Sequence, residues 1–137
     1  MNNGDYSSQQ NIEVLKESEI RAQRQRAAIA ELAVHTTISS GDVAGAKQVL
    51  TETSSHVLRV ERSSVSLMSD DGTMLECIDL FEATPGKHSQ GVVLKSLDYP
   101  WYFESIRTNS RIPAGDARTD LRTSEFTQNY LVPLGIK

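Results

Sequence analysis

The sequence predicts an α+β protein in which helices pack on the faces of an antiparallel sheet. From Ile12 to about Thr37 the chain has neither Pro nor Gly, and good helix formers dominate. From Ser63 the apolar residues alternate with polar ones, which indicates β-strands. A second helical region follows Pro100. Helices, then strands, then helices again are typical of the α+β class.

Two helices are expected before the first strand. The first covers 12–37, and its apolar seam is interrupted by Glu19 and Arg26, so the pattern does not establish a coiled coil. Gly41 ends this region and Asp42 begins the second helix, over 42–58. Seven residues at helical spacing are expected to form its inward face: Val43, Ala46, Val49, Leu50, Thr53, Val57 and Leu58.

A β-hairpin is expected next. Residues 63–69 and 74–82 are extended runs, and Asp70-Asp71-Gly72 between them is a turn signal. We expect 83–88 to be a loop and 91–95 to be a third short strand.

The last third of the chain returns to helical patterns. Pro100 suits the first turn of a helix over 100–107, because its missing N–H is not needed there. Residues 111–113 read as extended and 114–122 as a charged loop. A final helix is expected over 123–132, with Phe126, Tyr130 and Leu131 inward and Pro133 closing it.

Composition narrows the class of protein. The 137 residues carry a net charge of -4, which argues against nonspecific nucleic-acid binding. The single cysteine, Cys77, cannot form an intramolecular disulfide and suits a reducing compartment. The N-terminus lacks the basic and apolar blocks of a secretory signal, and no apolar run is long enough to span a membrane. We therefore expect a cytoplasmic protein that inserts no helix into a membrane.

Residues 28–136 carry a pattern of short motifs at intervals along the chain. These motifs are Ala28 to Leu32, Gly41-Asp42, Glu61-Arg62-Ser63-Ser64-Val65-Ser66-Leu67, Cys77-Ile78-Asp79-Leu80-Phe81, His88-Ser89-Gln90-Gly91, Tyr99-Pro100-Trp101-Tyr102-Phe103, Asp116-Ala117-Arg118-Thr119-Asp120 and Tyr130-Leu131-Val132-Pro133-Leu134-Gly135-Ile136. In this pattern the chain resembles a bacterial GAF domain of the kind found upstream of histidine kinases, diguanylate cyclases and phosphodiesterases.

The resemblance implies a GAF/PAS-like fold whose last strands are missing after Ile136. The expected organisation is a frayed segment 1–10, an N-terminal signalling or dimerisation helix 11–27, and an incomplete GAF-like domain 28–137. Three strand candidates are also few for so many apolar helical faces, which independently suggests an unfinished sheet.

Seven residues are candidates for a ligand pocket: Tyr99, Trp101, Phe103, Cys77, His88, Asp116 and Arg118. The aromatic residues could wall a pocket for a flat or apolar ligand, or belong to the core. Cys77 fits a small buried residue better than a thiol nucleophile. His88 is the most plausible histidine to face a ligand, although a structural hydrogen bond is the commoner role.

The charged pair Asp116 and Arg118 has two interpretations. Alternating signs favour a loop held by ion pairs, and the alternative is an arginine that binds a carboxylate or phosphate. No histidine pair lies one turn apart, so the spacing indicates no metal site, and the cofactor is left open.

Two functions remain after these exclusions. One is a regulatory sensor module that binds a small molecule or partner and biases a downstream effector domain, such as a histidine kinase or diguanylate cyclase. The other is a ligand-free dimerisation module, a homodimer through its N-terminal helices. An enzyme is not expected, because no nucleophile, general base and stabilising group occur together.

Overall fold

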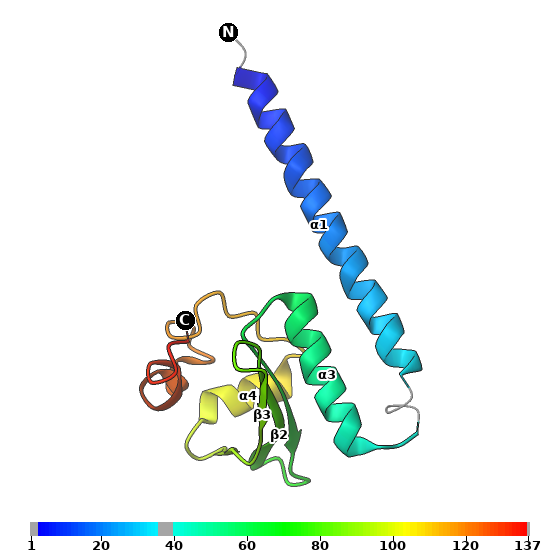
Figure 1. Ribbon diagram of the computed structural model, residues 1–137. Coiled ribbons are helices and arrows are strands. Elements are labelled where there is room, and N and C mark those ends of the chain that lie inside the picture. Colours follow the sequence, from blue (N-terminus) through cyan, green and yellow to red (C-terminus); the bar gives the residue numbers. More distant parts are fainter. Residues whose placement is uncertain (1–2, 36–39, 137) are drawn as a thin grey trace. The chain divides into compact units, whose positions relative to one another are not determined.

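A computed structural model describes residues 3–35 and 40–136 and confirms the α+β class (Figure 1). The helices are α1 (Asn3–Val34), α3 (Val43–Leu58) and α4 (Pro100–Thr108). The strands are β1 (Arg62–Met68), β2 (Met74–Glu82), β3 (Lys87–Ser89) and β4 (Val93–Lys95). A 3-10 turn, η1 (Ser124–Phe126), and a π-helical turn, η2 (Thr127–Leu131), follow.

Strand β2 is the centre of the antiparallel sheet. It lies between β1 on one side and β3 on the other, and β4 also pairs with it. The first half of β2 pairs with β4, where Leu75 lies opposite Leu94. The second half pairs with β3, where Phe81 lies opposite His88. The predicted hairpin 63–82 is confirmed, and the third predicted strand is β4.

The chain divides into two compact units along this sheet. The first unit comprises Met1–Val65 and Ile78–Gln90, and the second comprises Ser66–Cys77 and Gly91–Lys137. The following description treats each unit by itself.

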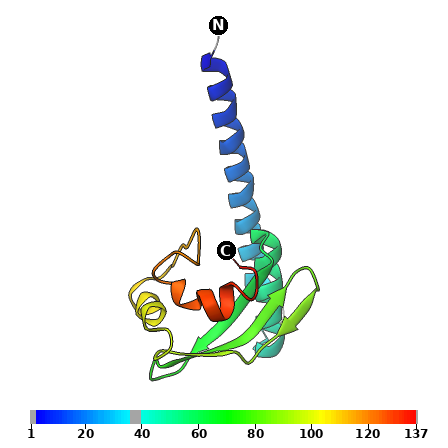
Figure 2. The same cartoon turned by 90° about the vertical axis from the view of Figure 1, so that its left-hand side faces the viewer.

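In the first unit, α1 is longer than the expected helix at its start. It begins at Asn3, so most of the segment expected to be frayed is helical, while the expected end at Thr37 lies outside the described residues. Side chains from Ser7 to Arg21 are all exposed. The side chain of Ala22 is half-buried and that of Ala28 is buried, in the stretch where α1 runs beside α3 (Figures 1 and 2).

Helix α3 has defined ends, as expected. The Asp42 side chain accepts a hydrogen bond from the Gly45 N–H at 3.0 Å, which caps the first turn. At the other end Arg59 adopts a left-handed conformation, with φ of 54°, and its N–H bonds to the Ser55 carbonyl. That conformation stops the helix at Leu58.

The inward face of α3 differs from the expected one. The buried residues are Thr51 and Ser55, whereas Val43 and Leu58 from the predicted face are exposed. The buried side chains are tolerated because they are hydrogen-bonded: Ser55 Oγ donates to the Val60 carbonyl at 2.7 Å, and Thr51 bonds to the sheet. Hydrophobic spacing therefore predicted the partly buried side of α3 that faces α1, but not the polar side that packs on the sheet.

In the second unit, a side-chain network forms the hairpin turn. Asp71 Oδ1 accepts hydrogen bonds from the Ser69 hydroxyl at 2.7 Å and from the N–H and hydroxyl of Thr73 at 3.0 and 2.7 Å. The Ser69 bond and those from Thr73 lower the pKa of Asp71 to about 2. Gly72 supplies the positive φ, 69°, that this turn requires.

The core of the second unit is aromatic. Phe126 is buried and stacks on Tyr99 with ring centres 4.5 Å apart, while Tyr102 meets it edge-on at 4.8 Å. Phe103 of α4 is 1% exposed. The expected helix 123–132 is instead the succession of η1 and η2, which still turns Phe126 and Leu131 inward.

Candidate functional site

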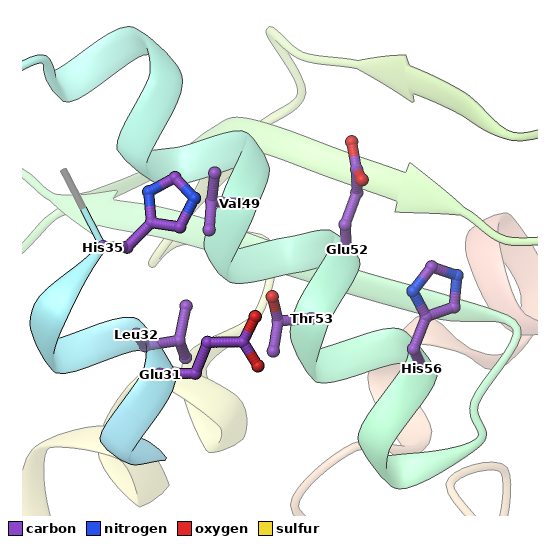
Figure 3. A pocket seen from close by; sticks show the side chains of 7 residues that line it. All are labelled: Glu31, Leu32, His35, Val49, Glu52, Thr53 and His56. Carbon is purple, nitrogen blue, oxygen red and sulfur yellow. The ribbon is translucent and has the colours of Figure 1, made fainter. Parts of the chain in front are cut away.

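The first unit holds a cavity of about 220 Å³ between the end of α1 and the middle of α3. Figure 3 shows the side chains that line it: Glu31, Leu32, His35, Val49, Glu52, Thr53 and His56. Leu32 and Val49 give it an apolar wall. Two carboxylates and two imidazoles give it both hydrogen-bond acceptors and hydrogen-bond donors. This lining offers both hydrogen bonds and an apolar surface to a small polar molecule.

The same sequence spacing occurs at both walls of the cavity, with His35 just beyond the end of α1 at Val34. His35 follows Glu31 by four residues, and His56 follows Glu52 by four. On a helix this separation puts both members on one side. In Figure 3 the Glu31 carboxylate faces Thr53 across the groove between the helices.

Glu52 also belongs to a hydrogen-bonded cluster behind the cavity. Its Oε1 lies 2.9 Å from His88 Nε2 on β3. The other ring nitrogen, His88 Nδ1, lies 3.0 Å from Asp79 Oδ2 on β2. Asp79 is 2% exposed, and the Thr51 hydroxyl donates to its Oδ2 at 2.5 Å. Residues of α3, β2 and β3 are thus joined through one imidazole.

The cluster favours the charged form of His88. Burial lowers the pKa of this imidazole, but the hydrogen bonds to Glu52 and Asp79 and the charges of both carboxylates outweigh it, so the pKa is raised above 6.5. A protonated ring donates from both nitrogens, which matches a carboxylate at each one. Phe81 lies against the ring, with centres 4.9 Å apart.

A second contact strengthens the attachment of α3 to the strands. Lys47 Nζ donates to the Ile78 carbonyl at 2.8 Å and to Gln90 Oε1 at 2.7 Å. Lys47, Thr51 and Ser55 are spaced by four and form one polar stripe of the helix. Among the described residues, no three His, Cys, Asp or Glu side chains are arranged to hold a metal ion.

His88 is the one predicted pocket residue in the first unit, and it lies on β3 within a segment expected to be a loop. It does not line the cavity itself but contacts Glu52, which does. The other six candidates belong to the second unit.

Among those six, the aromatic residues have different environments. Phe103 is buried and Tyr99 stacks on Phe126, whereas Trp101 is 67% exposed. A cavity of about 540 Å³ does adjoin α4, but its walls are other residues: Tyr102, Ile106, Asn109, Ser110, Arg111, Ile112 and Thr123.

The remaining candidates hold backbone in place. Cys77 is half-buried in β2, and its N–H donates to the Val92 carbonyl at 2.8 Å. Asp116 Oδ1 accepts from the Arg118 N–H at 2.9 Å. Arg118 Nε in turn donates to the Ile136 carbonyl at 2.6 Å. Asp116 and Arg118 thus bond to backbone groups, and an ion pair in this loop joins Asp120 to Arg122.

Sequence reasoning missed the cavity and most of the cluster. The repeated Glu-x-x-x-His spacing was one available signal, because it occurs once at the end of α1 and once within α3. Asp79 was another, since it is an acidic residue inside the apolar run of β2.

Comparisons with models of protein families, with curated proteins and with solved structures gave no match to this chain. No helix among the described residues has the length and apolar character needed to cross a membrane.

Proposed function

We propose that this chain is the regulatory sensor module of a bacterial signal-transduction protein. It binds a small-molecule ligand or partner in the cavity between α1 and α3 and biases a downstream effector, such as a histidine kinase or diguanylate cyclase. The α+β fold and the resemblance of residues 28–136 to GAF domains support this proposal. On this proposal the chain acts in the cytoplasm and is not itself an enzyme.

The observation that carries the proposal is the double role of Glu52. Its side chain lines the cavity, and the same carboxylate accepts the hydrogen bond of His88. A ligand that draws the Glu52 carboxylate into the cavity weakens its contact with His88. Occupancy of the cavity is thereby coupled to the attachment of α3 to β3.

Such coupling supplies what a switch requires, namely two arrangements with different affinity for the ligand. The second wall of the cavity, with Glu31 and Leu32, belongs to α1. A ligand that bridges the walls favours one packing of α1 on α3 over another. Helix α1 would then carry the change away from the site.

A melting experiment tests the proposal. The wild-type chain is heated in the presence of a panel of probes: amino acids, putrescine, spermidine and cyclic nucleotides. At least one probe is expected to raise the melting temperature in proportion to the logarithm of its concentration. Glu31→Gln should abolish the shift, while Glu104→Gln, an exposed substitution in the second unit, should keep it. A panel without any shift, or a shift unaffected by Glu31→Gln, would sink the proposal.

The exposed apolar residues of α1 favour a second candidate function. Ile12, Leu15 and Ile29 are each more than half exposed, which is unusual for residues of this kind on one helix. They support a dimerisation module that relays signals through its helices without a ligand. The melting experiment separates the two, because the second candidate predicts no shift with any probe.

A further inference from the structure

Helix α1 has a continuous free face that its own chain does not cover. At 100° per residue, six positions fall within an arc of about 100°. They are Ile12, Leu15, Glu19, Ala22, Arg26 and Ile29. Side chains that contact α3 or line the grooves beside it, such as Ala28 and Leu32, lie on a different side. Helix α1 can therefore contact α3 and a second helix at once.

An apolar groove lies beside this face. It has a volume of about 260 Å³ and is lined by Gln25, Ala28, Ile29, Leu32, Thr53, Ser54, Val57 and Leu58. Ile29 and Leu58 remain 67% and 54% exposed at its edges. Val43 and Leu50 of α3 are exposed as well. Apolar surface gathered in this way marks an interaction site.

We propose that α1 of a second copy of this chain packs on the free face, next to this groove, and runs antiparallel to the first α1. Ile12 of the second copy then lies opposite Ile29, and Leu15 of the second copy lies against the aliphatic part of Arg26. The two-fold axis passes near the midpoint between Ile20 and Arg21. Every contact therefore occurs twice, which makes the interface closed and self-complementary.

Glu19 and Arg26, the two charged residues of the free face, determine whether the two α1 helices pair parallel or antiparallel. In a parallel pair, Glu19 would meet Glu19 of the second copy and Arg26 would meet Arg26, and both contacts are repulsive. In the antiparallel pair, Glu19 shares a layer with the small Ala22 of the second copy. Arg26 of that copy lies one turn away and can reach the Glu19 carboxylate. The interruption of the seam therefore specifies orientation.

The proposed pairing covers a long stretch of α1. From Ile12 to Ile29 the helices overlap by roughly 26 Å, at 1.5 Å per residue. Residues 7–21 have no cover from their own chain, and the groove begins just beyond them at Gln25. Each copy thus covers exposed apolar residues of the other, such as Ile12, Leu15 and Ile29.

Sedimentation of the wild-type chain and two variants tests whether the dimer exists. The wild type should sediment at about twice its 15.1 kDa mass, and Ile12→Ser/Leu15→Ser should sediment as a monomer. Ile20→Ser is the matched control and should stay dimeric. Ile20 is 49% exposed, close to the 52% of Ile12, but it lies about 130° from the centre of the free face. A monomeric wild type, or equal effects of both variants, would overturn the proposal.

A charge exchange tests the direction. Glu19→Arg should weaken the dimer about tenfold, because each Arg26 then faces a positive charge in the antiparallel pair. Adding Arg26→Glu should restore the wild-type dissociation constant. A parallel pair predicts no such rescue, since like charges face each other in every variant. Equal dissociation constants for the single and double variants would therefore overturn the antiparallel arrangement.

This inference rests on the proposed function only where α1 is taken as the output helix. The two can fail separately. A monomeric chain that still melts higher with a probe removes the dimer and leaves the sensor. A dimer that responds to no probe removes the sensor and leaves this interface.

Discussion

His88 Nε2 lies 2.9 Å from Glu52 Oε1, and this contact joins the short strand β3 to the middle of α3. The other nitrogen of the ring contacts the buried Asp79. An imidazole placed between two carboxylates binds its proton more tightly than a free one does. The cluster therefore makes stability depend on pH.

The free energy of unfolding should fall as the pH rises above 6.5. The pKa of His88 is raised in the folded chain, so its stabilising contribution is complete below the unfolded value of 6.5. The contribution is lost as the pH rises through the folded pKa. Urea unfolding across about pH 6 to 9 measures this slope. His88→Gln should flatten this slope, and Trp101→Ala, an exposed substitution at a residue that does not titrate, should keep it. A wild-type slope equal to that of His88→Gln would contradict the assignment.

Asp79→Ala should destabilise the chain by about 3 kcal/mol. The substitution removes the acceptor of both Thr51 and His88 at a buried position, and breaking a buried polar pair is costly. Urea unfolding at pH 6 is the measurement. Glu104→Ala, at an exposed position, should change stability by less than about 0.5 kcal/mol. Equal midpoints for the two variants would show that the cluster does not stabilise the fold.

The elements that the sequence predicts well are those with local signals. Asp71 and Gly72 specify the turn between β1 and β2, and both strands lie close to their predicted bounds. Pro100 begins α4 as expected. In each case the residues that determine the structure are neighbours in the chain.

The elements that the sequence does not predict depend on distant partners. Strand β3 has only three residues, and it is a strand because it pairs with β2. The buried side of α3 is polar because Asp79, 28 residues from Thr51, accepts its hydrogen bond. His88 was predicted as a candidate, but its contact with Glu52 spans 36 residues. Local periodicity carries no information about such pairs.

Phe126→Ala should destabilise the chain by about 3 to 5 kcal/mol, since it removes the ring at the centre of the aromatic core. Trp101→Ala should cost less than about 1 kcal/mol, because that side chain is exposed. Thermal unfolding of both variants measures the difference. A loss at Trp101 as large as that at Phe126 would contradict the placement of these rings.

Glu125→Ala should lower the free energy of unfolding by about 1 kcal/mol, because it removes hydrogen bonds at the start of α4. The Glu125 carboxylate accepts hydrogen bonds from the N–H groups of Trp101 and Tyr102 at 3.2 and 3.0 Å. Tyr99, at the N-cap position, makes no such bond with its own side chain, so a residue 24 positions away from Trp101 caps this helix. The negative charge of Glu125 also interacts favourably with the positive N-terminal end of the helix dipole.

The separate effects of this cap and its charge can be measured. Glu125→Gln keeps a hydrogen-bond acceptor without the charge and should lose less stability than Glu125→Ala. Salt should narrow the gap between the wild type and Glu125→Gln, because it screens the charge and leaves the hydrogen bonds. Unfolding of the three proteins at low and high ionic strength tests this order. If Glu125→Gln proved as unstable as Glu125→Ala at both salt concentrations, the stabilisation would come from charge or packing and not from the cap.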